Sequence, residues 1–169
     1  MDPLIISIIA IVVSFSALIV TIWESIEIRR NNRLTVIPKL TFITSLSGIE
    51  HFIGIQVKNN GFGLAIIKKF SIFVDEKLLS TESNAGWNKA FTKLGLKKIE
   101  VVWGEWEPND ASGVGNIQNI LIINESVLTP EKRKIFMSAI KRLKISIEYE
   151  SIYGECFLSE WKYSENIAD

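Results

Sequence analysis

The chain has 169 residues with 19 Lys and Arg, 19 Asp and Glu, one His and one Cys, and its formal net charge at pH 7 is zero. This balance gives no indication of a general nucleic-acid binder. One Cys cannot form a disulfide within the chain, and one His with one Cys cannot supply the usual nitrogen and sulfur ligands of a zinc site. We therefore predict no metal site and no cofactor.

The first feature along the chain is an apolar segment, residues 3–23, without a single charge. As a helix, about 21 residues rise about 30 Å, the thickness of the hydrocarbon core of a bilayer. The alternatives are a signal peptide and a buried core helix. A signal peptide would need a basic start and a small-residue end, whereas Met1-Asp2 precede this segment and Glu24 follows it. We predict a membrane-spanning helix with Trp23 at the interface.

The residues on either side of the span indicate its orientation. Arg29, Arg30, Arg33 and Lys39 follow the span, while no Lys or Arg precedes it. Because Lys and Arg remain on the cytoplasmic side, we expect the N-terminus outside and the rest of the chain in the cytoplasm. The predicted location is the bacterial inner membrane, and a chain with a single Cys suits a reducing compartment.

Small residues recur along one face of the span, at alternating steps of three and four. They are Ser7, Ala10, Ser14, Ala17 and Thr21, and the same spacing continues to Glu24. Small and hydroxylated residues allow membrane helices to approach closely, so this stripe predicts a parallel homo-oligomer. The alternative is that the hydroxyls bond to their own helix and face lipid. A further hypothesis is a narrow wet path lined by the stripe, with a ring of Glu24 at its cytoplasmic mouth.

The remaining chain carries strand patterns beyond a charged stalk that stops before Pro38. We assign residues 1–33 to the transmembrane helix and stalk, and residues 34–169 to one cytoplasmic β-rich domain. Alternating or continuous apolar segments predict strands at 40–44, 53–57, 65–75, 98–103, 117–123, 144–149 and 156–161. Turns are expected at 59–61 and 75–77, and a hairpin at 151–154.

Two helices interrupt these strands. Residues 87–94 form a short helix that ends at Gly95, and a second helix starts with Thr129 as its N-cap and runs to about Leu143. Its expected buried face comprises Ile135, Phe136, Ala139, Ile140 and Leu143. The predicted fold class is an N-terminal transmembrane α-helix plus a mostly antiparallel, β-sandwich-like α+β domain with two short helices.

Basic residues of the second helix are the candidates for binding an anion. They are Lys132, Arg133, Lys134, Lys141 and Arg142, with Lys68-Lys69 and Lys97-Lys98 expected in strands. A solvated helix face is the simplest explanation for them; the alternatives are anionic lipid headgroups and a phosphate-bearing ligand. Trp103 and Trp106 beside the loop 107–113 are candidates for stacking on a base or anchoring a partner, with core packing as the alternative.

Catalytic readings of the sequence are weak. His51 is expected on a turn or surface, and Cys156 is expected as a buried, inert thiol. The glycine-rich stretches 60–63 and 112–115 lack the spacing of a phosphate loop and predict turns. Asp110 with Glu105 would be the carboxylates of an enzyme or of a hard-cation loop. We predict no catalytic residues and no enzyme activity.

Three blocks carry a resemblance to a family of uncharacterised bacterial single-pass membrane proteins with a cytoplasmic β-rich domain. They are the basic stalk 30–34, the block 57–75 (VKNNGFGLAIIKKFSIFVD) and the block 145–155 (ISIEYESIYGE). Where such families usually have Pro after the glycine pair, this chain has Leu64. The architecture is more loosely similar to small membrane effectors of antiphage systems, which implies a cytoplasmic domain that senses a cyclic nucleotide.

These observations predict a membrane-anchored sensor-effector that acts by homo-oligomeric helix packing. Its expected partners are the lipid bilayer, further copies of the chain, and an anionic nucleotide or a cytoplasmic protein. The alternative function is a passive membrane tether or assembly subunit for a cytoplasmic protein complex.

Overall fold

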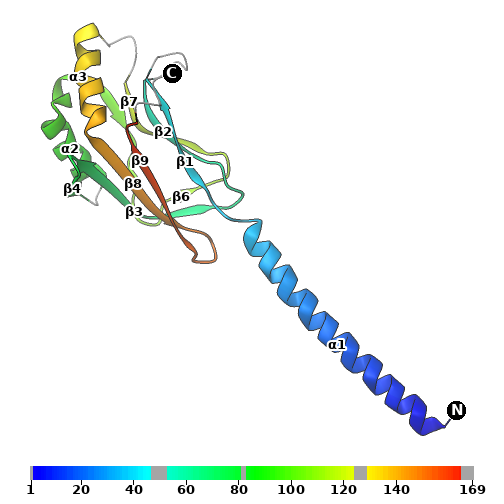
Figure 1. The fold of residues 1–169 in the computed structure, drawn as a ribbon. Coiled ribbons are helices and arrows are strands. Elements are labelled where there is room, and N and C mark those ends of the chain that lie inside the picture. The colour runs from blue at the N-terminus through cyan, green and yellow to red at the C-terminus, as the bar shows by residue number, and fades with distance from the viewer. Residues whose placement is uncertain (1, 47–52, 81–82, 124–128, 165–169) are drawn as a thin grey trace. The chain divides into compact units, whose positions relative to one another are not determined.

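The computed structural model describes residues 2–46, 53–80, 83–123 and 129–164 of the chain. Its contacts divide the chain into two compact units, Met1–Val36 and Ile37–Asp169. The first unit contains one helix, and the second contains strands and two shorter helices (Figure 1).

Helix α1 covers Pro3–Leu34, with Pro in its first turn and Arg33 in its last. The apolar segment and the charged stalk therefore form one continuous helix of 32 residues. None of these residues is buried in the single chain. The helix is long and apolar enough to cross a membrane, although an N-terminal signal sequence can have the same length and composition.

The strands of the second unit form two antiparallel sheets within the described residues. The first sheet has the order β1 (Leu40–Ser45), β2 (Ile53–Asn59), β7 (Ile117–Ile123) and β5 (Val101–Trp103). The second has the order β4 (Lys77–Ser80), β3 (Ala65–Val74), β8 (Leu143–Glu150) and β9 (Cys156–Lys162), and β6 (Ala111–Ser112) also pairs with β3. The predicted α+β class and the mostly antiparallel pairing are confirmed.

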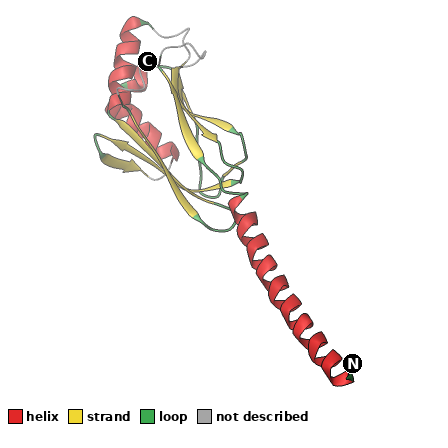
Figure 2. Cartoon of the chain, turned by 45° about the vertical axis from the view of Figure 1, so that its right-hand side comes forward, coloured by secondary structure: helices red, strands yellow, loops and turns green. Residues whose placement is uncertain are grey.

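Helices α2 (Ser83–Leu94) and α3 (Pro130–Lys141) lie toward the end of the unit away from the start of β1 (Figure 2). Gly95 has a positive φ of 74° and ends α2, as glycine at that position predicts. The Thr129 hydroxyl accepts a hydrogen bond from the Lys132 amide, which confirms the predicted N-cap.

One hydrophobic cluster contains residues of both sheets and of both helices. Ile53, Ile55 and Val57 of β2 are buried, in agreement with their alternating pattern. Trp87 of α2 is fully buried, and its ring lies 6.2 Å from the ring of Phe70 and 5.5 Å from the ring of Phe91. The cluster therefore joins α2 to the middle of β3.

Several details differ from the sequence predictions. Leu143 is buried as expected but begins β8, because α3 ends at Lys141. Ile135 of α3 is 45% exposed, because it lies about 100° around the helix from the buried Phe136. Leu96–Lys98 form a 3₁₀ helix, so Lys97 and Lys98 do not lie in a strand. Cys156 is exposed, since it begins the edge strand β9 beside the hairpin. The short strands β4 and β6 were not predicted, because so few residues show no clear alternation.

Candidate functional site

The small-residue stripe of α1 has its hydroxyl groups satisfied within the helix. Each hydroxyl donates to the carbonyl oxygen four residues earlier: Ser7 to Pro3 at 3.0 Å, Ser14 to Ala10 at 2.8 Å and Thr21 to Ala17 at 2.9 Å. Ser16, which lies off the stripe, bonds to Val12 in the same way at 2.8 Å. The stripe therefore presents a narrow, smooth surface whose hydroxyl hydrogens point back to the backbone, and Ala10, Ala17 and Glu24 are exposed along it.

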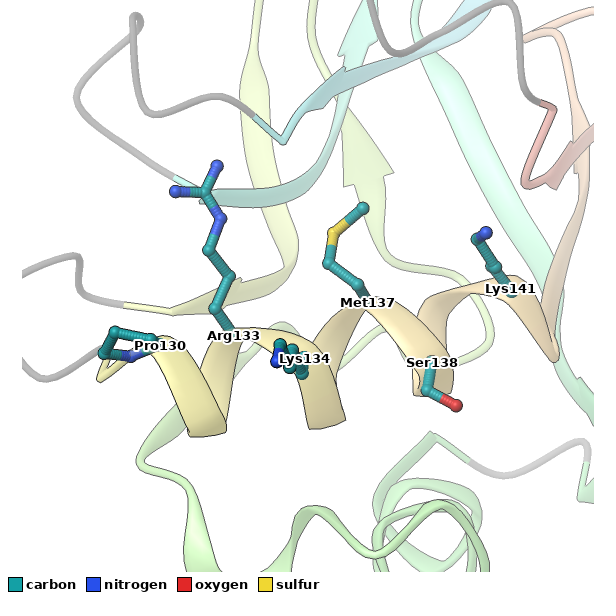
Figure 3. A pocket seen from close by; sticks show the side chains of 6 residues that line it. All are labelled: Pro130, Arg133, Lys134, Met137, Ser138 and Lys141. Atoms are coloured by element: carbon teal, nitrogen blue, oxygen red, sulfur yellow. The ribbon is translucent and has the colours of Figure 1, made fainter.

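An open groove of about 620 Å³ runs along α3 in the second unit. Its lining is Pro130, Arg133, Lys134, Met137, Ser138 and Lys141. Three of the five basic residues that the sequence singled out on this helix are thus brought together. Figure 3 shows Arg133, Met137 and Lys141 rising from the same side of α3. The groove combines positive charge with the apolar surface of Met137 and Pro130.

Two of these three cations contact the rest of the domain. The Arg133 guanidinium donates to the carbonyl oxygen of Leu46 at 3.0 Å, and the Lys141 ammonium lies 5.4 Å from the centre of the Tyr163 ring. These contacts hold both side chains over one side of the helix. The Lys134 side chain is exposed and takes part in none of the ion pairs among the described residues.

The other predicted residues lie elsewhere. Arg142, the C-cap of α3, makes two hydrogen bonds of 2.7 Å to the carboxylate of Asp75. Lys132 is half-buried beside the N-cap. Trp103 contacts Phe91 at 5.0 Å between ring centres and lines a separate small pocket of about 220 Å³, while Trp106 is buried in the core. The two tryptophans and Arg142 are therefore not part of the α3 groove lining.

Hydrogen bonds within two ion pairs shift the pKa values of three groups at or beside the turn between β3 and β4. The hydrogen bonds from Arg142 lower the pKa of Asp75 and raise that of Arg142 itself. The hydrogen bond from Lys162 lowers the pKa of Glu76. Both carboxylates are fixed by the second sheet and by the end of α3, so their role is to hold this turn in place.

Cross-strand ion pairs occupy the basic residues of β3. Lys68 lies 2.7 Å from Glu150 and Lys69 lies 3.3 Å from Glu148, both across the β3–β8 pair. Lys144 of β8 lies 2.9 Å from Glu160 of β9. Exposed pairs of this kind contribute little stability, but they neutralise the lysines. The strand lysines therefore offer no concentrated positive surface.

The described part of the chain holds no group of three or more His, Cys, Asp or Glu residues arranged for a metal ion. The Asp110 carboxylate accepts a hydrogen bond from the Glu107 amide at 2.8 Å, which closes a turn. The exposed Cys156 thiol lies 3.9 Å from the carbonyl oxygen of Gly154. His51 lies outside the described residues.

Sequence reasoning missed the role of Asn59. The Asn-Asn-Gly sequence predicts a turn, but Asn59 is fully buried and makes side-chain hydrogen bonds to four backbone groups. Only its place at the end of a strand pattern, before Gly61, could have indicated this role. Asn59 determines how the neighbouring loops meet.

No protein-family model, curated protein or solved structure matches this chain. The resemblance to bacterial single-pass proteins and antiphage effectors therefore stays a prediction.

Proposed function

We propose that this protein is a membrane-anchored sensor-effector. Residues 37–169 would bind an anionic ligand in the bacterial cytoplasm, and α1 would associate as a parallel homo-oligomer that acts on the inner membrane. The observation that carries the proposal is the long apolar helix α1, none of whose residues is buried in the chain. Burying a large apolar side chain is favourable by about 1.5–3 kcal/mol, so such a helix would be stabilised by a bilayer or by further helices around it.

The orientation of the proposed anchor follows from charge. Arg29, Arg30 and Arg33 lie in α1 beyond the apolar segment, and Lys39 follows the helix. Positive residues favour the cytoplasmic side, so the second unit would be cytoplasmic and the short N-terminus would lie outside.

The association of α1 would depend on close packing and not on hydrogen bonds between helices. The stripe hydroxyls of Ser7, Ser14 and Thr21 already bond to their own helix. Small side chains at these positions allow two backbones to approach, and dispersion contacts then hold the helices together. Adding bulk to the stripe should therefore weaken association, whereas removing a hydroxyl should not.

The groove along α3 supports a ligand that carries both negative charge and an apolar or aromatic face. Arg133, Lys134 and Lys141 provide the charge, and Met137 provides an adaptable apolar surface. A nucleotide signal has this combination of properties, and it is the class of ligand that the resemblance to antiphage effectors implies.

The domain that carries this groove would be a β-sandwich. Side-chain hydrogen bonds join the two sheets along one side: Trp161 to Thr44 at 2.8 Å and Ser159 to the carbonyl oxygen of Leu40 at 3.0 Å. The phenol of Tyr149 also accepts from the Leu40 amide at 3.2 Å. These bonds would hold β1 against β8 and β9 and give the groove a firm support.

Substitutions at Ser14 and Ser16 test the association in mild detergent. The wild type and Ser14→Ala should form the same oligomer by native mass spectrometry and by chemical crosslinking. Ser14→Leu should be monomeric, while the control Ser16→Leu, which adds the same bulk off the stripe, should remain oligomeric. A monomeric wild type would contradict the effector proposal and would leave a membrane tether as the function.

A further inference from the structure

Three loops of the second unit expose apolar side chains at their tips. They are the loops 60–64, 113–116 and 151–155, which we call the entry-end loops. Phe62 is 78% exposed, Val114 60% and Ile152 53%. Leu64, Ile117 and Tyr153 on or beside the same loops are also exposed. Exposed apolar side chains become informative where several gather on one surface, so the positions of these loops matter.

Hydrogen bonds place these loops at one end of the domain. The Asn59 amide donates to the carbonyl oxygens of Gly63 and Ser112, at 2.8 and 2.9 Å. The backbone amide of Gly115 donates to the Asn59 carbonyl oxygen at 2.8 Å. The hairpin 151–155 follows Glu150, which pairs with Ile66 at the start of β3. Figure 1 shows the β8–β9 hairpin and the start of β3 at the same end of this unit.

The chain enters the domain at this same end. The Phe62 amide donates to the carbonyl oxygen of Ile37 at 3.0 Å, and the Asn60 amide donates to that of Lys39 at 2.8 Å. Helix α1 ends at Leu34, so only Thr35 and Val36 separate it from Ile37. Hydrogen bonds therefore attach the loop that carries Phe62 to the segment that directly follows α1.

The length of this connection limits the distance between the entry-end loops and the bilayer. The stalk 24–34 rises about 16 Å, two further residues add at most about 7 Å, and the headgroup layer itself occupies about 5–8 Å. A tilt of α1, which is usual for single spans, shortens the remaining distance. The connection therefore keeps the entry-end loops within about 20 Å of the headgroup layer, so the bilayer is always within their reach.

The far end of the domain differs in character. The turn between β3 and β4 carries Asp75 and Glu76, which are held by Arg142 and Lys162. Leu78 is 51% exposed beside this turn and pairs with Phe73, eight residues along β3 from its start. At about 3.3 Å per residue, this pair lies about 26 Å from the entry end. Leu78 is therefore a matched exposed side chain far from the proposed contact.

We propose that the entry-end loops dock on the lipid surface beside α1, with Phe62, Val114 and Ile152 in the interfacial layer. Aromatic and aliphatic side chains are favourable there, and the exposed Lys39 beside the Phe62 loop suits anionic headgroups. The docking rests on the membrane anchor of the proposed function, but it needs neither the oligomer nor the ligand. Docking would hold the domain on the bilayer, so that a conformational change in the domain would be transmitted to α1.

Fluorescence quenching by lipid tests this docking on the full chain in vesicles of phosphatidylcholine and phosphatidylglycerol. In a Cys156→Ser background, an environment-sensitive dye is attached at Phe62→Cys, Val114→Cys, Ile152→Cys or, as the control, Leu78→Cys. Lipids spin-labelled near the headgroup should remove most of the emission at positions 62, 114 and 152 and little at position 78. For each variant, tryptophan emission that is unchanged from that of the Cys156→Ser parent verifies the fold.

Equal quenching at position 78, or no quenching at positions 62 and 114, would overturn the docking. The same cysteines can also be tested for crosslinking between chains. Positions that crosslink and whose dyes stay unquenched would assign the loops to a contact with a second copy, and this result would also overturn the docking. Vesicle flotation separates this failure from that of the proposed function. Protein that floats with the vesicles without quenching contradicts the docking alone, whereas protein that does not float contradicts the anchor and the docking together.

Discussion

The side-chain amide of Asn59 donates a hydrogen bond to the carbonyl oxygen of Ser112 at 2.9 Å, which joins the end of β2 in one sheet to β6 in the other. Its second N–H bonds to Gly63, and its oxygen accepts from the backbone amides of Gly61 and Lys39. Two donors and two acceptor positions are the full capacity of an amide. One buried side chain therefore holds together the start of β1, the loop 60–64 and β6.

Asn59→Ala should lower the free energy of unfolding of the domain by about 3 kcal/mol. A net hydrogen bond contributes about 1 kcal/mol, and the buried backbone groups that lose their partner add a desolvation penalty. Chemical denaturation of the full chain in mild detergent measures the change. Asn60→Ala, at the exposed neighbouring position, is the control and should be within about 0.5 kcal/mol of the wild type. A stable Asn59→Asp variant would contradict this reading, because a carboxylate cannot donate to Gly63 and Ser112.

The sequence predicted the elements around Asn59 more successfully than their connections. Ile53, Ile55 and Val57 alternate clearly, so β2 and its buried face were predicted from local pattern alone. The burial of Asn59 depends on β6, a strand of two residues that lies 52 positions further along the chain. No local signal marks such a contact, because a polar residue before a glycine is usually a solvated turn.

The same limit applies to the candidate groove. The basic residues of α3 were visible in the sequence, but which of them share a surface depends on the partners that the fold supplies. Arg133 bonds to Leu46, just after β1, whereas Arg142, at the end of the same helix, bonds to Asp75 after β3. A helical wheel places these two arginines about 180° apart, but it cannot identify the partner of either, because the partners are supplied by long-range packing.

Gly61→Ala should destabilise the domain by about 2 kcal/mol, because the added methyl group meets backbone. A Cβ atom at Gly61 would lie 2.3 Å from the Lys39 nitrogen and 2.4 Å from the Ile37 oxygen. Backbone atoms cannot rotate away as a flexible side chain can, and overpacking of this kind costs about 1–3 kcal/mol. Thermal or chemical unfolding measures the effect.

Gly113→Ala provides the matched control for Gly61→Ala. Gly113 lies in a neighbouring entry-end loop, and a methyl group added to it would have no atom of the described residues within 4 Å beyond its chain neighbours. Its replacement by Ala should leave stability unchanged or raise it slightly, since Ala reduces the freedom of the unfolded chain. Equal losses for the two variants would show that the close approach of loop 60–64 to Ile37–Lys39 is not what stabilises this end.

Acidification should remove the contributions of Asp75 and Glu76 to stability. Their pKa values in the folded protein are lowered from 3.8 and 4.5, by hydrogen bonds from Arg142 and Lys162 respectively. A carboxyl group with a lowered folded pKa stabilises the fold above its unfolded pKa, and this contribution is lost as the pH falls through the folded value. The wild type should therefore lose stability as the pH is lowered from about 4.5.

The double variant Asp75→Asn and Glu76→Gln tests this assignment through the slope of stability against pH. It should be less stable than the wild type at pH 7 and should lose less stability between pH 5 and pH 3. Glu27→Gln, which removes a carboxylate from α1 and none of the ion pairs of the domain, is the control and should keep the wild-type slope. A double variant with that same slope would show that other groups cause the acid sensitivity.

Lys134→Glu should weaken the binding of an anionic nucleotide to the α3 groove by about tenfold, which corresponds to about 1.4 kcal/mol. Lys134 lines the groove and is exposed, so reversing its charge replaces attraction by repulsion without disturbing the Leu46 and Tyr163 contacts of its neighbours. Titration calorimetry of the full chain with cyclic mononucleotides, cyclic dinucleotides and inorganic phosphate provides the measurement. Lys89→Glu makes the same change on the exposed face of α2 and should bind as the wild type does. Equal weakening by both variants would show a diffuse charge effect that salt screens, and the absence of binding by every nucleotide would contradict the groove as an anion site and favour the tether.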